Sequence, residues 1–222
     1  TTTLFWTNEL GLWFLAAMFD DTDAGRAWAA FARRSLETEI DVQVLPDGAD
    51  FESSVPYHRL VAELFMGAAR LADTRGERLS DHYRSRVSDM AAYLADVTRP
   101  DGLMPQSGDA DDGRLHVLGG LSTASPQDGR HLLGPAAAMF GRADWMAIGG
   151  DAAAWEAAWW GLEPPAPAKS YPDVARLYPD AGHAVVRDGA NYLLVTNSIV
   201  GTKGFAAFIP LVSLAAILTV VA

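Results

Sequence analysis

Helical spacing of apolar residues dominates the first two-thirds of this 222-residue chain. Apolar side chains recur there every three or four positions, as on one face of an amphipathic helix. Four long segments show the pattern: Leu10–Met18, Ala24–Val44, Pro56–Ala72 and Ser80–Val97. Two more helices are expected at about His131–Phe140 and Asp144–Trp160. Long helices joined by short turns predict a mainly α architecture built from helical hairpins.

The pattern changes after residue 160. Gly161–Ala168 reads GLEPPAPA, which is typical of an extended, proline-rich linker. His183–Arg187 and Tyr192–Asn197 are β-like segments that flank Asp188-Gly189, and this arrangement predicts a hairpin. The predicted division is a helical domain over 1–160, a linker over 161–170, the start of a β-domain over 171–204 and an apolar tail over 205–222.

The tail, Phe205–Ala222, is a run of eighteen residues without a charge. Its length is at the lower limit for a membrane span, and Pro210 and the lack of basic residues after it weaken that reading. Buried strands are an alternative. At the other end, Thr1–Thr3 shows no secretion signal, so the chain is expected to begin inside a domain. We interpret the tail first as a truncation or reading-frame change and second as a membrane segment.

Charge and cysteine content exclude several functions. The formal net charge of −11 and the pI near 4.7 argue against a nucleic-acid partner. A polyanionic ligand would need a local cationic cleft, to which His58, Arg59 and Arg114 would contribute. The chain has no cysteine, which excludes disulfides, thiolate chemistry and Cys-based metal sites.

The segment Leu45–Val61 is the most informative part of the sequence. A Pro-Asp-Gly turn leads to Ser54, a good helix cap, and Pro56 suits the first helical turn. Tyr57, His58 and Arg59 follow at the mouth of the helix, where backbone N–H groups and the macrodipole favour an anion. A phenol and an imidazole placed there can transfer protons. The alternative is an ordinary helix start with a capped end and an apolar core face.

Three segments together resemble the heparinase II/III-like polysaccharide lyases. They are Leu45–Val61, the loop Thr98–Leu115 (TRPDGLMPQSGDADDGRL) and Tyr178–Leu193 (YPDAGHAVVRDGANYL), which occur in the family's order. The resemblance implies an incomplete (α/α) toroid of helical hairpins, followed by the first strands of an antiparallel β-domain. It also implies a periplasmic or secreted location.

The resemblance further implies a lyase that cleaves uronic-acid-containing polysaccharide by β-elimination, without a metal or cofactor. Tyr57 matches the family's catalytic tyrosine, and His58 is the second catalytic candidate. The predicted substrate-binding residues are Glu52, Arg59, Gln106, Asp109 and Arg114. Arg59 has an alternative role, an ion pair with Glu63 four residues on. Asp109, Asp111 and Asp112 do not follow the EF-hand spacing, so no calcium site is predicted.

Two further catalytic elements of the family have no counterpart in these residues. Its Asn-His pair would fall on Thr3 and Leu4, and no histidine follows His183 to supply its later His. Lyase activity near background is therefore expected. The alternatives are a non-catalytic carbohydrate-binding helical module, a hydrolytic toroid that uses carboxylates such as Glu52 and Asp109, and a membrane-tethered structural protein.

Overall fold

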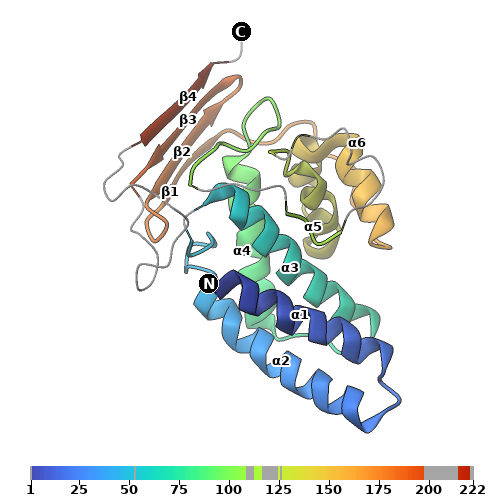
Figure 1. Ribbon diagram of the computed structural model, residues 1–222. Helices are drawn as coiled ribbons and strands as arrows, with labels where there is room; N and C mark the ends of the chain where they lie inside the picture. The colour runs from blue at the N-terminus through green and yellow to red at the C-terminus, as the bar shows by residue number, and fades with distance from the viewer. Residues whose placement is uncertain are drawn as a thin grey trace.

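A helical part and an antiparallel sheet make up the computed structural model, which describes residues 2–52, 54–108, 113–116, 125, 127–197 and 215–220 (Figure 1). Side chains are described from residue 8 to residue 197 within those ranges. The mainly helical fold with a following antiparallel sheet is as predicted. The closed ring of a toroid and the domain division stay predictions.

Four long helices form the first part of the chain. They are α1 (Thr2–Met18), α2 (Asp23–Gln43), α3 (Val55–Thr74) and α4 (Asp81–Val97). Side chains of Thr22, Ser54 and Ser80 cap α2, α3 and α4 by accepting a backbone N–H from the first turn. These local signals explain why three predicted helix starts agree with the structure to within one residue. Helix α1 begins eight residues earlier than predicted, at Thr2 instead of Leu10.

The second helical group follows the long loop after α4. A short 3-10 turn, η2 (Arg130–Leu132), runs into α5 (Leu133–Phe140), and α6 (Ala143–Trp159) packs against both. Gly141, with φ of 69°, ends α5 in the left-handed conformation that favours glycine. Both helices were predicted from the sequence.

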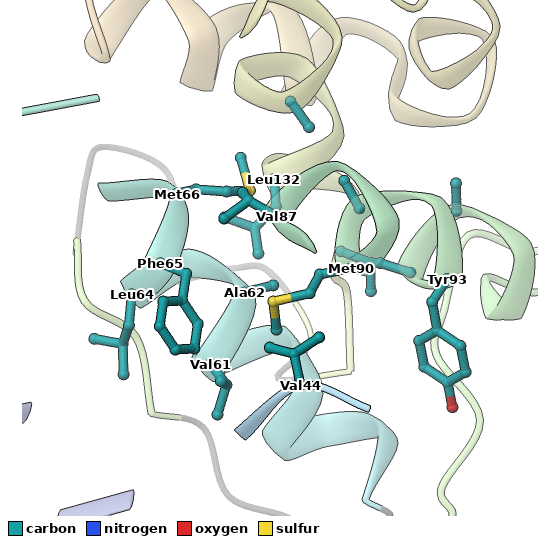
Figure 2. Packing of buried hydrophobic residues seen from close by; sticks show 14 of the residues in the cluster. Val44, Val61, Ala62, Leu64, Phe65, Met66, Val87, Met90, Tyr93 and Leu132 are labelled. Carbon is teal, nitrogen blue, oxygen red and sulfur yellow. The ribbon is translucent and has the colours of Figure 1, made fainter. Parts of the chain in front are cut away.

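The core of the helical part lies between α3 and α4. Ala62 and Met66 of α3 point toward Val87 and Met90 of α4, and Val44 at the end of α2 lies against the same cluster (Figure 2). All five side chains are buried. Burial of these apolar faces, rather than intrinsic helix propensity, supplies most of the stability of such helices.

Four strands form one sheet in the order β1-β2-β3-β4, with every neighbouring pair antiparallel. They are β1 (Val174–Tyr178), β2 (His183–Asp188), β3 (Asn191–Thr196) and β4 (Ala215–Val220). The predicted hairpin is β2–β3. Strand β4 falls in the apolar tail and pairs with β3, so this part of the tail is a strand, while its burial stays a prediction. Among the described residues, no helix is both long and apolar enough to cross a membrane.

Candidate active site

Tyr57 lies in the first turn of α3, and local contacts fix that turn. Its backbone N–H donates to Ser54 Oγ at 3.2 Å, and the N–H of Val55 donates to the carbonyl of Ser107 at 3.1 Å. The Tyr57 side chain is half-buried, so it is not sealed within the core. The hydrogen bond between Val55 and Ser107 holds the loop that carries exposed Gln106 beside the first turn of α3. The sequence predicts that the substrate binds at this turn.

His58 points into the core. Its Nδ1 accepts a hydrogen bond from the N–H of Asp50 at 3.1 Å, so Nε2 carries the proton and donates to the carbonyl of Met90 at 2.9 Å. Burial lowers the pKa of the imidazole from 6.5 to about 4. The predicted catalytic role does not fit this geometry, because both ring nitrogens are already bonded inside the protein. His58 holds α3, α4 and the preceding turn together.

Arg59 and Glu63 attach the 113–116 segment to α3. Arg59 is fully buried and its Nη2 donates to the carbonyl of Gly113 at 2.8 Å. The carboxylate of Glu63 accepts the N–H groups of Leu115 and His116, at 2.9 and 3.0 Å. Glu63 therefore binds the loop backbone, a role that the sequence did not suggest, since its partners lie about fifty residues further along the chain.

Arg114 lies next to a buried histidine. Its Nη1 is 3.0 Å from Nδ1 of His131, and its Nη2 donates to the carbonyl of Asp128 at 3.3 Å. The pKa of His131 is lowered to about 3, first by burial and then by the positive charges of Arg114 and Arg59. Two guanidinium groups therefore lie close to His131, beside the buried carboxylate of Glu63 that binds the neighbouring Leu115 and His116. Arg114 is half-buried, whereas Arg59 has no exposed surface.

The other predicted site residues are placed as follows. Glu52 is half-buried at the turn before α3, and its N–H donates to Asp50 Oδ2 at 3.3 Å. Asp109 lies outside the described residues, so its expected contact with Arg114 stays a prediction. Within the part of the chain that the structure describes, no group of three His, Cys, Asp or Glu side chains could hold a metal ion.

Helices α1 and α3 run parallel, which brings the start of α1 level with Tyr57. Nε1 of Trp13 donates to the carbonyl of Ala68 at 3.3 Å, and Arg75 beyond the end of α3 donates to the carbonyl of Ala17 at 3.3 Å. Counting back eleven residues along each helix, from Trp13 and from Ala68, leads to Thr2 and Tyr57. The first turn of α1, which contains the positions expected for the Asn-His pair, Thr3 and Leu4, therefore lies at the same end of the helix pair as the first turn of α3, which contains Tyr57; Figure 1 shows the two helix starts at one end.

Comparison with known proteins gives one family. The family model described as the heparinase II/III N-terminus matches residues 5–121. A heparin-sulfate lyase from Bacteroides stercoris is 30% identical over 99 residues, which cover 44% of this chain and 15% of that protein. The chain therefore spans only a small part of the length of this curated relative.

Solved structures share the fold. A heparinase III gene product matches 91% of this chain with a TM-score of 0.66 at 20% identity, over 28% of its own length. The heparan sulfate lyase HepC from Pedobacter heparinus matches 90% with a TM-score of 0.63 at 20% identity, over 29% of its own length. Since the family model covers more than half of the chain, the chain belongs to the heparinase II/III family and carries that family's N-terminal region.

Proposed function

We propose that this chain carries the proton-transferring tyrosine of a polysaccharide lyase that cleaves uronic-acid-containing chains by β-elimination. The observation that supports this most is the position of Tyr57, half-buried in the first turn of α3 and level with the start of α1. Relatives named as heparin-sulfate and heparan sulfate lyases favour a sulfated, uronate-containing polysaccharide as the substrate.

The proposed reaction has three parts. The uronate carboxylate is first neutralised, for which Arg114 is the reachable cation; buried Arg59 adds its charge and holds the loop. A base then removes the proton on C5, and an acid protonates the glycosidic oxygen as its bond to C4 breaks. A double bond forms between C4 and C5. The Tyr57 phenol serves as the acid, and the N-terminus of α3 stabilises its phenolate form.

The rate expected from these 222 residues is low. Neither Thr3 nor Leu4 offers the amide or imidazole of the family's Asn-His pair, and no histidine follows His183. A weakly acidic C5 proton is harder to remove when fewer groups neutralise the neighbouring carboxylate. We therefore expect slow but Tyr57-dependent product formation.

Ultraviolet absorbance of the unsaturated uronate tests the proposal. The chain is incubated with heparan sulfate beside the Tyr57→Phe variant, which keeps the ring and removes only the hydroxyl. His58→Gln is a further comparison; among variants that stay folded it should retain activity, because His58 lies in the core. Product that forms equally fast with Tyr57→Phe would contradict the role of Tyr57. Binding without any product would favour a non-catalytic carbohydrate-binding module.

A further inference from the structure

A cavity of about 240 Å³ opens at the far end of α3 from Tyr57. Its walls come from α1, the second half of α3, the 113–116 segment and the end of α6; they are Phe14, Gly67, Arg70, Leu71, Thr74, His116, Trp159 and Trp160. Thirteen residues of helix separate Tyr57 from Arg70, which corresponds to about 20 Å. The cavity is therefore separate from the candidate active site.

Four of the eight residues that line the cavity carry aromatic rings. The ring of His116 packs edge-to-face against Phe14, with centroids 6.4 Å apart, and against Trp160, with centroids 5.3 Å apart. Trp160 is held in place because its Nε1–H donates to Glu156 Oε1 at 3.2 Å. Trp159 stands at the rim with 56% of its surface exposed, and an exposed indole of this size often marks a binding surface.

Gly67 leaves room between these rings. A Cβ atom at this position would come within 3.0 Å of Leu115 Cδ2 and 4.0 Å of the Phe14 ring. Such close approaches explain why the wall has no side chain here. Any larger residue would project toward the same rings and reduce the space between them.

Polar groups lie on one side of the cavity. Arg70 donates from Nε to the carbonyl of Trp160 at 2.9 Å and from Nη2 to that of Gly161 at 3.0 Å. In the described part of the chain, its Nη1 has no hydrogen-bond partner. The Thr74 hydroxyl donates to the carbonyl of Leu71 at 2.7 Å, which leaves its oxygen able to accept. An anionic group next to a hydroxyl would satisfy both residues.

We propose that this cavity binds one acidic sugar unit of a polysaccharide, at a position remote from Tyr57. A pyranose ring presents C–H groups to aromatic faces and hydroxyls along its edge, and a guanidinium group recognises carboxylate or sulfate. The volume is below that of pockets for drug-sized ligands, so it suits a single sugar ring. The inference rests on the proposed function, because the acidic polysaccharide is the substrate proposed there.

Calorimetric titration of the chain with a heparan sulfate tetrasaccharide tests this site. All variants carry Tyr57→Phe, so that the probe stays intact. Trp159→Ala should weaken binding about tenfold, and Thr74→Val should weaken it to a smaller extent. The control is Trp28→Ala, which removes an exposed indole of α2 that does not line the cavity. It should change the affinity less than twofold, and a neutral maltotetraose should bind more weakly than the acidic probe.

Unchanged affinity in both Trp159→Ala and Thr74→Val would overturn the proposal, as would an equal loss in Trp28→Ala. Thermal unfolding of each variant shows that a lost affinity does not come from lost folding. The two proposals fail separately. If Tyr57→Phe abolishes product while the cavity variants bind normally, the lyase proposal stands and the cavity proposal falls. If the chain forms no product but its binding is weakened by the cavity variants, the cavity proposal stands and the lyase proposal falls.

Discussion

The Asp96 carboxylate on α4 accepts a 2.6 Å hydrogen bond from the hydroxyl of Tyr178 on β1, eighty-two residues later in the chain. The other carboxylate oxygen accepts the hydroxyl of Tyr171 at 2.5 Å, and Arg176 forms an ion pair with Asp96 at 3.0 Å. Asp96 itself is only 1% exposed. Burial and the adjacent Asp96 charge raise the pKa of Tyr178, so its phenol stays protonated as a donor. This cluster joins the helical part to the sheet.

Asp96→Asn should destabilise the protein by about 2–4 kcal/mol. The amide keeps the shape of the side chain, but it has only one accepting oxygen and no charge. One of the two tyrosine hydroxyls then loses its acceptor, and Arg176 loses its ionic partner. Urea unfolding measures the difference. The exposed Asp188 on β2 provides the control, since Asp188→Asn should change stability by less than about 0.5 kcal/mol. Equal stabilities of the two variants would contradict the role of Asp96.

Local signals explain what the sequence could predict of the fold. Ser54 and Ser80 cap helices within their own first turn, and the Asp188-Gly189 turn joins two neighbouring strands. Asp96 shows what the sequence could not predict: its position indicates only a polar residue near the end of α4. Its partners are Tyr171 and Tyr178, whose approach depends on how the sheet docks. No spacing pattern encodes that contact.

In the candidate site, too, local features were predictable from the sequence and contacts between distant segments were not. Tyr57 could be found because its helix start and its motif are contiguous in sequence. His58 stands next to it, but its direction depends on Met90 in another helix, and adjacent helical residues point about 100° apart. For Glu63, helical spacing indicates only an ion pair with Arg59, because the loop N–H groups that Glu63 binds are distant in sequence.

Stability should fall in mild acid because of His58. The imidazole has a pKa of about 4 in the folded protein against 6.5 when unperturbed, so the unfolded chain binds the proton more readily. The stability that neutral His58 contributes is present above pH 6.5 and is lost as the pH falls toward 4. At pH 5 the loss from this group is about 2 kcal/mol. Buried His183, whose pKa is also lowered to about 4, should add a loss in the same direction.

Urea unfolding at pH 7 and pH 5 isolates the effect when wild type is compared with His58→Gln. Glutamine can accept the Asp50 N–H and donate to the Met90 carbonyl, but it does not titrate. The variant should therefore lose about 2 kcal/mol less than the wild type between the two pH values. Carboxyl groups with raised pKa values, such as Asp50, affect both proteins alike. An identical loss in both would show that His58 does not cause the pH dependence.

A side chain at Gly48 should destabilise the protein more than a side chain at Gly76, although both glycines have a positive φ. Gly48 has φ of 92°, and a Cβ atom there would lie 2.6 Å from the carbonyl oxygen of Asp89 on α4. Gly76 has φ of 70° and nothing within 4 Å of such an atom. We expect Gly76→Ala to cost about 1 kcal/mol from backbone strain alone.

Gly48→Ala should cost clearly more, about 3 kcal/mol, because Asp89 must also move. Thermal or urea unfolding of the two variants gives the comparison. A similar loss in both would mean that the turn before α3 shifts freely away from α4.

Glu63→Gln should loosen the loop that carries Arg114. The carboxylate of Glu63 is fully buried and accepts two adjacent backbone N–H groups, whereas glutamine offers one oxygen and turns an NH2 group toward the other donor. One buried N–H is left unsatisfied, at a cost of about 1–3 kcal/mol. Hydrogen exchange at the amides of Leu115 and His116 should become faster, and product formation should fall because Arg114 directly precedes Leu115.

The control for this prediction is Glu163→Gln, a change of the same charge at an exposed position. It should leave both the amide exchange and the reaction unaltered. Exchange rates separate a positioning role from a general loss of stability, because global unfolding exposes amides throughout α3 and α4, whereas release of the loop exposes only its own. If Leu115 and His116 exchange no faster in Glu63→Gln, the loop is held by Arg59 and its bond to Gly113 instead.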